Sequence, residues 1–387
     1  MHASSSFKPL FSLPDGLHYL NCAYMAPLSR RVAAAGHAAL DRLGAPSRVP
    51  ASDFFDPCDE VRARFARLVN VTDPQRIALI PSVSYGMATV ARNTPVTAGG
   101  NLVVVEGQFP SNVHVWRRLA VERRAELRSV PAPGTDGGRA HGWNEAVLAA
   151  IDERTAVVAV PPFHWTDGSR FDLEAIGGRA RDRGAAFVVD GTQAVGAVPF
   201  DCGRTAPDAL VCAGYKWLTG PYSVGVAYFG PAFDGGVPLE ENWITRRGSD
   251  DFAHLATGRD EYRPGAVRYD VGERSNFVLL PMLAAALAQV LEWSPAAVET
   301  HTRALTVSAA AALRDLGCGI EEDGWRAPHI LGVRLPAGLD PASLARQLHL
   351  RNISVSVRGR GLRVAPHLYN DADDLAALVE VVRGSLD

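Results

Sequence analysis

Two side chains in this sequence could carry out chemistry together, namely the carboxylate of Asp190 and the amine of Lys216. Asp190 directly follows the apolar run 187–189, and Lys216 comes shortly after a second apolar run at 209–213. Short apolar runs bounded by glycine or aspartate are typical of buried strands in α/β proteins. The two strands would therefore bring an acid and an amine to one edge of a sheet, where open α/β sheets bind ligands.

Lysine is rare in this chain. Lys8 and Lys216 are the two lysines among 39 basic residues, so the other 39 − 2 = 37 are arginines. Arginine would serve as well as a plain cation, but it stays protonated in proteins and cannot form a Schiff base. We therefore favour a nucleophilic role for Lys216 over the alternative of an ordinary cation at the end of a strand.

The composition excludes several classes of function. A chain of 387 residues can bury a large core and form two lobes, and its net charge of −3 indicates no nucleic-acid surface. Its five cysteines include no CxxC pair, which favours a reducing compartment over a disulfide framework or a zinc site. The N-terminus lacks a signal-peptide pattern, and the longest apolar run, near 282–291, is too short to span a bilayer. We expect a cytoplasmic protein without a membrane partner.

The elements that would position Asp190 and Lys216 alternate between strands and helices. We predict strands at 77–80, 102–105, 126–130, 155–160, 187–190 and 209–213, and helices at 84–93, 112–124, 143–152 and 173–183. This alternation predicts a mostly parallel sheet with helices on both faces. Two helices, 29–43 and 59–69, precede it. A Gly/Pro loop is predicted at 131–142 and a long loop at 230–272. Beyond that loop we predict helices at 276–293, 296–316, 341–350 and 372–383, and strands at 330–335, 353–357 and 361–364.

The motifs around these residues resemble those of the class V aminotransferase family. They are Asp-Gly-Thr-Gln at 190–193, Tyr215-Lys216 with the lysine 26 residues after Asp190, and the Gly-Pro-Tyr-Ser-Val-Gly segment that follows. The family contains cysteine desulfurases, kynureninases and isopenicillin N epimerase-like enzymes. The resemblance extends from about residue 19 to about residue 378, and it implies a fold-type-I enzyme that uses pyridoxal 5′-phosphate (PLP).

For the fold, the resemblance implies an α/β protein with a mostly parallel seven-stranded sheet in a large domain and a smaller α/β C-terminal domain. We expect an N-terminal arm with a short first strand at 1–28, a large PLP-binding domain at 29–294 and a small domain at 295–387. The resemblance also implies a homodimer with shared active sites.

The resemblance implies that Lys216 and Asp190 are the catalytic residues. Lys216 would hold the cofactor as a Schiff base and then move the Cα proton of the substrate, and Asp190 would pair with the pyridine nitrogen. Phe109 would stack on the ring, Gln193 would bind the phenolic oxygen, and Tyr215 is a candidate phosphate contact. The alternatives are capping of a turn for Asp190 and core packing for Phe109.

The segment Pro-Ser-Val-Ser-Tyr-Gly at 81–86 lies between a predicted strand and a predicted helix. Hydroxyls and free N–H groups at a helix N-terminus bind anions, although capping the helix is the alternative role for a serine there. In the family this segment holds the cofactor phosphate, which implies contacts from Val83 and Ser84. The chain has no Walker A lysine and no GxGxxG motif, which argues against a nucleotide-binding loop.

Three further residues are implied near the cofactor. Thr166 matches family residues that hydrogen bond there, with a turn at 167–168 as the alternative. Trp243 and Asn276 lie in loops that the family sends across a dimer interface, and packing within that interface is the alternative role for Trp243.

Two residues are implied at the substrate. Arg363 matches the family's Arg…Tyr-Asn motif, and a guanidinium can bind an α-carboxylate through two hydrogen bonds. Asn21 lies in the predicted first strand, 19–23, which in the family approaches the substrate. The loop 358–361 contains no cysteine, so desulfurase-type sulfur transfer is disfavoured. We therefore expect an aminotransferase acting on an amino acid or amine. The alternatives are a PLP-dependent lyase or epimerase and, last, a non-catalytic binding protein on the same scaffold.

Overall fold

The structure is a computed structural model that describes residues 7–134 and 138–386. The first six residues of the predicted arm, residues 135–137 of the predicted Gly/Pro loop and the last residue of the predicted small domain lie outside the described residues.

A seven-stranded sheet forms the centre of the fold. Its order is β2 (Ile77–Ile80), β8 (Gly225–Phe229), β7 (Ala209–Ala213), β6 (Ala186–Asp190), β5 (Thr155–Val160), β3 (Asn101–Val105) and β4 (Glu126–Val130). Strand β8 runs antiparallel to β2 and β7, and all other neighbours are parallel. This confirms the predicted mostly parallel sheet. Strands β2, β3 and β7 are buried along their whole length, which explains their uninterrupted apolar runs.

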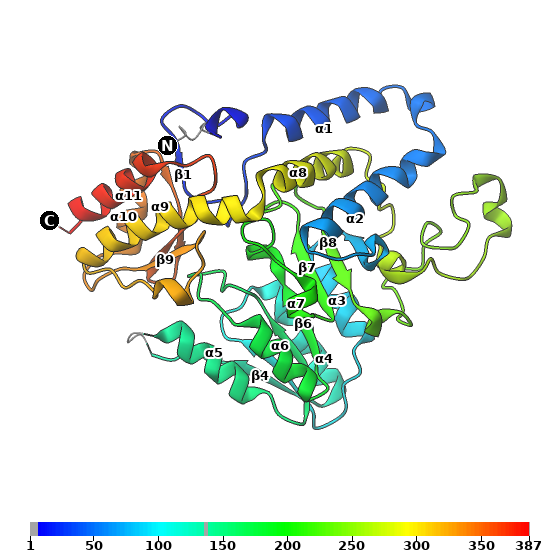
Figure 1. Cartoon of the computed structure of the whole chain (residues 1–387), viewed down its shortest axis with the longest axis horizontal. Coiled ribbons are helices and arrows are strands. Elements are labelled where there is room, and N and C mark those ends of the chain that lie inside the picture. The colour runs from blue at the N-terminus through cyan, green and yellow to red at the C-terminus, as the bar shows by residue number, and fades with distance from the viewer. Residues whose placement is uncertain (1–6, 135–137, 387) are drawn as a thin grey trace.

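Helices cover both faces of the sheet (Figure 1). One hydrophobic core joins the sheet to α2 (Asp56–Leu68), α5 (Arg139–Ala150), α6 (Leu173–Asp182) and α8 (Leu279–Trp293). The other core joins it to α3 (Val83–Asn93) and α4 (His114–Arg123). Helix α1 (Arg30–Leu43) packs on α8, and the short α7 (Cys202–Thr205) lies between β6 and β7 in the sequence.

Helix α5 begins earlier than predicted. The sequence predicts a loop through residue 142, but the helix already includes Arg139–Gly142. Ala140 is buried, so packing of this first turn outweighs the low helix propensity of Gly142.

The C-terminal elements form a second α/β unit, drawn in orange and red at the left of Figure 1. Its antiparallel sheet has the order β11 (Ser356–Arg358), β12 (Gly361–Val364) and β9 (Leu331–Arg334). Helices α9 (Pro295–Asp315), α10 (Pro341–Leu350) and α11 (Ala372–Gly384) share a separate core with it. The predicted strand at 353–357 is interrupted, because its first part, β10 (Ile353–Ser354), pairs with β1 (His18–Tyr19). The first strand was predicted at 19–23 and is shorter in the structure, where β1 comprises His18–Tyr19. Asn21 lies beyond β1 and forms an isolated β-bridge with Ala365.

None of the helices within the described ranges is both long and apolar enough to cross a membrane by itself, and α8 with α9 satisfies that criterion only as a pair bent by 70°.

Candidate active site

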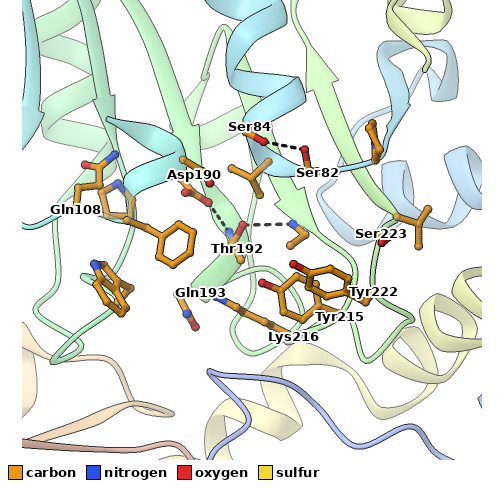
Figure 2. Close-up of a pocket in the computed structure, with 18 of the residues that line it drawn as sticks. Ser82, Ser84, Gln108, Asp190, Thr192, Gln193, Tyr215, Lys216, Tyr222 and Ser223 are labelled. Carbon is orange, nitrogen blue, oxygen red and sulfur yellow. Dashed lines mark hydrogen bonds between the residues drawn. The ribbon is translucent and has the colours of Figure 1, made fainter. Parts of the chain in front are cut away.

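A cavity of about 320 Å³ opens at the carboxyl ends of β6 and β7 (Figure 2). The two strands are parallel neighbours, with Asp190 paired to Val211, so Asp190 and the turn after β7 emerge at the same edge. That turn carries Lys216, which lines the cavity together with Asp190 and the start of α3. The structure thus brings together the acid and the amine that the sequence analysis singled out.

Lys216 is a buried cation without a counterion. Its side chain is 6% exposed, and its Nζ makes no hydrogen bond or ion pair with any residue in the described part of the chain. The rings of Phe109 and Tyr215 lie near it, with centroids 5.2 and 5.6 Å from Nζ. Burial, followed by the charge of Arg363, lowers the pKa of Lys216 to about 8. The lowered pKa increases the neutral fraction of this amine at neutral pH, and the neutral amine can act as a nucleophile or base.

Asp190 is held by the residue two positions further along the chain. The backbone N–H of Thr192 donates to Oδ1 of Asp190 at 3.1 Å, and the Thr192 hydroxyl accepts a hydrogen bond from Ala213 at 3.2 Å. Burial raises the pKa of Asp190, while the hydrogen bonds from Thr192 and the charge of Lys216 act in the opposite direction. A buried, fixed carboxylate of this kind favours a cationic partner in the cavity.

The first turn of α3 also lines the cavity, and Figure 2 draws its Ser82 and Ser84 above Thr192 and Lys216. Ser82 is the N-cap, because its hydroxyl accepts a hydrogen bond from the N–H of Tyr85 at 3.2 Å. The hydroxyls of Ser82 and Ser84 are 2.8 Å apart, and Val83 also lines the cavity. The N–H groups of a first helical turn have no acceptors within their own helix, so this turn combines free donors with the positive end of the helix dipole. It is suited to bind an anionic group.

The side-chain amide of Gln193 offers an N–H group, and not its oxygen, for a further hydrogen bond. Its Oε1 accepts a hydrogen bond from Nε1 of Trp217 at 2.8 Å, and its Nε2 donates to the carbonyl of Ala23 at 3.1 Å. An indole N–H can only donate, which fixes the orientation of the amide. The second N–H of Nε2 remains as a donor, and Gln193 lines the cavity.

A second cavity of about 350 Å³ adjoins the first, since Lys216, Phe109, Tyr215 and Trp165 line both. Phe109 and Trp165 meet edge to face, with ring centroids 5.4 Å apart. Arg363 lines only the second cavity. Lys216 therefore lies where the two cavities join, between Asp190 on one side and Arg363 on the other.

Arg363 is 1% exposed and makes no ion pair with a carboxylate among the described residues. Its Nη1 donates to the carbonyl of Trp165 at 2.8 Å, and its Nη2 donates to the hydroxyl of Ser356 at 3.3 Å. Burial, followed by the charge of Arg358, lowers the pKa of Arg363 to about 9. A guanidinium that is buried without a counterion is a site for a carboxylate. Asn21 does not line either cavity. Its Oδ1 instead accepts a hydrogen bond from the Ser356 hydroxyl at 2.8 Å, and that hydroxyl in turn accepts one from Arg363.

Three residues implied near the cofactor do not line the first cavity of this chain, and their predicted roles remain predictions. Thr166 does not line the cavity, because its hydroxyl turns to Nδ1 of His164 at 2.7 Å. Trp243 is 41% exposed and packs on the rings of Phe54 and Phe252, with centroids 6.1 and 5.6 Å away. Asn276 is exposed and caps α8 by accepting hydrogen bonds from the N–H groups of residues 278 and 279.

Several residues at the site were not predicted from the sequence, above all Trp165, Thr192 and Arg358. Trp165 is the immediate neighbour of Thr166, so the family position was one residue away from the side chain that reaches the cavity. A signal for Thr192 was present in the Asp-Gly-Thr-Gln motif, since a threonine two residues after a strand-end aspartate can return a hydrogen bond to it. Arg358 carried no such signal.

Comparisons with known proteins bear on the family and the fold of this chain. The model of the Aminotransferase class-V family matches residues 47–386. Among curated proteins, the chain is 24% identical to the uncharacterized aminotransferase YcbU of Bacillus subtilis, over 83% of this chain and 82% of that protein. It is 27% identical to isopenicillin N epimerase of Streptomyces clavuligerus, over 84% of this chain and 83% of that protein.

Among solved structures, a mutant of the cystine C–S lyase C-DES with glycine covalently linked to its PLP cofactor has the same fold. Its TM-score is 0.80 at 17% identity, and the match covers 96% of this chain and 98% of that one.

Proposed function

Because the chain belongs to the class V aminotransferase family of PLP-dependent enzymes, we propose that it transfers the amino group of an amino acid to a keto acid. The observation that carries this proposal is the position of Lys216, a buried amine without a counterion, between the cavity that contains Asp190 and the cavity that contains Arg363.

The residues of the first cavity fit PLP. The amine of Lys216 has no partner among residues 7–134 and 138–386, so it is free to bond to the aldehyde of the cofactor. At the start of α3, Ser82, Val83 and Ser84 offer N–H and hydroxyl donors for a phosphate. Asp190 is a buried carboxyl group that forms no ion pair with any described residue, and it can pair with a protonated ring nitrogen.

Each residue then has a separate task. Bound PLP supplies a ring that withdraws electron density from the bonds at the substrate Cα. Lys216 would hold the cofactor, and its neutral amine would move the Cα proton of the substrate. Asp190 would keep the ring nitrogen protonated, and Phe109 would shield the ring from water. Arg363 binds the substrate α-carboxylate and thereby orients the Cα–H bond towards the lysine.

Cysteine desulfurases also belong to this family, and their reaction requires a reactive thiolate. All five cysteines of this chain are buried. Cys22 is close enough to the site to feel the charges of Lys216 and Arg363, but burial raises the pKa of its thiol to about 12. A thiol of this kind is protonated at neutral pH and is a poor nucleophile. We therefore do not propose sulfur transfer.

Epimerisation is the second candidate, and the similarity to isopenicillin N epimerase supports it. Both reactions begin with removal of the Cα proton, so a panel of L- and D-amino acids separates them. We expect the PLP-loaded enzyme to convert its cofactor to the pyridoxamine form, to release one keto acid per site, and to return to the PLP form when a keto acid is added. Loss of chirality at Cα without the pyridoxamine form would replace this proposal by epimerisation, and release of a side-chain fragment would replace it by a lyase reaction.

We also propose three more specific properties of the protein, namely a homodimer, a cytoplasmic location and a domain boundary at residue 294. The exposed Trp243, Phe252 and Leu255 support a homodimer, because they gather apolar surface on a segment that runs outward from the rest of the fold. Sedimentation of the purified protein tests this, and a monomer at micromolar concentration would contradict it. Free, buried cysteines support a reducing compartment. The 70° bend between α8 and α9 and the separate C-terminal core support the division.

A further inference from the structure

Arg358 is an arginine in the second cavity for which the proposed reaction has no task. It ends β11, and Arg363 lies on the neighbouring antiparallel strand β12. Both guanidinium groups lie against the same indole, since their central carbons are 5.1 and 6.0 Å from the ring centroid of Trp165. The distance between the Cζ atoms of Arg358 and Arg363 therefore cannot exceed the sum of their distances from the Trp165 ring centroid. Two guanidinium groups thus share one small cavity beside Lys216.

The described residues that line this cavity carry positive charge and no negative charge. Lys216, Arg358 and Arg363 line it, and none of its described lining residues is acidic. Arg358 donates from Nη1 to the carbonyl of Val357 at 2.8 Å, while its Nε is buried without an acceptor. Neither arginine makes an ion pair within the described ranges, whereas arginines elsewhere do, as Arg326 does with Asp323 at 2.9 Å. Burial also lowers the pKa of Arg358, as expected for a cation without a counterion.

We propose that Arg358 binds a second anionic group of the substrate, so that the substrate is an amino acid with a carboxylate at the end of its side chain. The inference rests on the proposed function, in which PLP occupies Lys216 and the α-carboxylate occupies Arg363. One cation, the partly buried guanidinium of Arg358, then remains, and a substrate with a single carboxylate would leave it without an ion pair to any described residue. A second carboxylate removes that penalty, and the planar guanidinium can bind it through two hydrogen bonds.

Binding of amine-free acids to the PLP-loaded enzyme tests this inference without turnover. Glutarate and adipate carry two carboxylates, and butyrate is a control with one. An anion bound beside Lys216 changes the absorbance of the Schiff base, so a titration gives the dissociation constant of each acid. We expect the better dicarboxylate to bind at least about tenfold more tightly than butyrate, the effect of one charge-assisted hydrogen-bonded contact.

Variants of neighbouring arginines identify the residue responsible. In Arg358→Gln we expect the preference for the dicarboxylate to disappear, while butyrate binding stays unchanged because Arg363 is intact. Arg360→Gln is the matched control, because Arg360 is exposed in the same hairpin, carries the same charge and does not line the cavity. It should keep the preference of the wild type. Arg358→Lys keeps the charge without the planar fork and should retain part of the preference, which also guards against misfolding of Arg358→Gln.

Equal binding of butyrate and both dicarboxylates to the wild type would overturn the inference, and so would an undiminished preference in a folded Arg358→Gln. These results are distinct from failure of the proposed function. An enzyme that transaminates neutral amino acids and ignores the second carboxylate would keep the proposed function and lose this inference. An enzyme that binds dicarboxylates through Arg358 but does not form pyridoxamine phosphate would keep this inference and lose the proposed function.

Discussion

Replacing Asp190 by asparagine isolates the charge of this residue. Asparagine has nearly the same size and keeps an oxygen that can accept the Thr192 N–H, which Asp190 binds at 3.1 Å. What is lost is the negative charge opposite a protonated ring nitrogen. Breaking a buried charge pair by removing one partner costs about 3–5 kcal/mol. If about 3 kcal/mol of this appears in the barrier to Cα proton removal, the rate falls by about 100-fold or more.

The same substitution should not destabilise the cofactor-free protein. Burial raises the pKa of Asp190 above that of the unfolded chain, so the folded state binds this proton more tightly. Ionised Asp190 therefore lowers the stability of the cofactor-free fold at neutral pH, and this penalty fades as the pH falls through the raised pKa. Asparagine carries no charge and removes the penalty. We expect the cofactor-free variant to melt at the same temperature as the wild type or higher.

The assay is a single-turnover reaction of the PLP-loaded enzyme with an amino acid, followed by absorbance. Asp190→Asn should bind PLP and react slowly. Asp201→Asn is the control, since Asp201 also caps a turn, accepting from the N–H of Gly203 at 2.7 Å, but lies outside the cavity. Its rate should equal that of the wild type. If Asp190→Asn carries bound PLP and reacts as fast as the wild type, Asp190 does not charge the ring and our reasoning about it is wrong.

Three further predictions concern the other side chains of the site. Ser84→Ala removes a hydroxyl at the start of α3. It should weaken PLP binding, measured by equilibrium dialysis, by about fivefold to tenfold, which is the contribution of one hydrogen bond. Unchanged binding would contradict the assignment of Ser84 to the phosphate. Arg363→Met should raise the KM of amino acids by about 100-fold and leave the KM of amines without a carboxylate unchanged. Equal increases in KM for amino acids and for these amines would indicate a purely structural role of Arg363. The cofactor-free enzyme should form its Schiff base faster as the pH rises, and the rate should level off above about pH 8. The reason is that the lowered pKa of Lys216 sets the fraction of neutral amine. A midpoint near the pKa of an exposed lysine would refute the effect of burial.

The strand ends of the site were predictable from the sequence because they depend on local patterns. Uninterrupted apolar runs mark β6 and β7 as buried, and parallel neighbours deliver their ends to one edge, so Asp190 and Lys216 could be brought together without a structure. The strand-to-helix boundary at Ser84 was equally local. Arg363 depended on a motif, because nothing in its neighbourhood distinguishes it from the other arginines.

The rest of the site depends on contacts between segments far apart in the sequence. Trp165 reaches the second cavity partly because the guanidinium of Arg363, 198 residues further along the chain, donates to its carbonyl. Arg358 becomes informative only once the hairpin of β11 and β12 is placed on that tryptophan. The hydroxyl of Thr166 contacts Nδ1 of His164, and its predicted role near the cofactor remains a prediction. The roles predicted for Trp243 and Asn276 require a second subunit and remain predictions.

The identity of the residue that carries the cofactor is the most direct test of the whole account. The PLP-loaded enzyme is reduced with borohydride, digested and mapped by mass spectrometry. Lys8 is the chain's other lysine and serves as an internal control. The account predicts one phosphopyridoxyl group per chain, on the peptide that contains Lys216, and none in Lys216→Ala. A label on Lys8, on the terminal amine or on no peptide would contradict it.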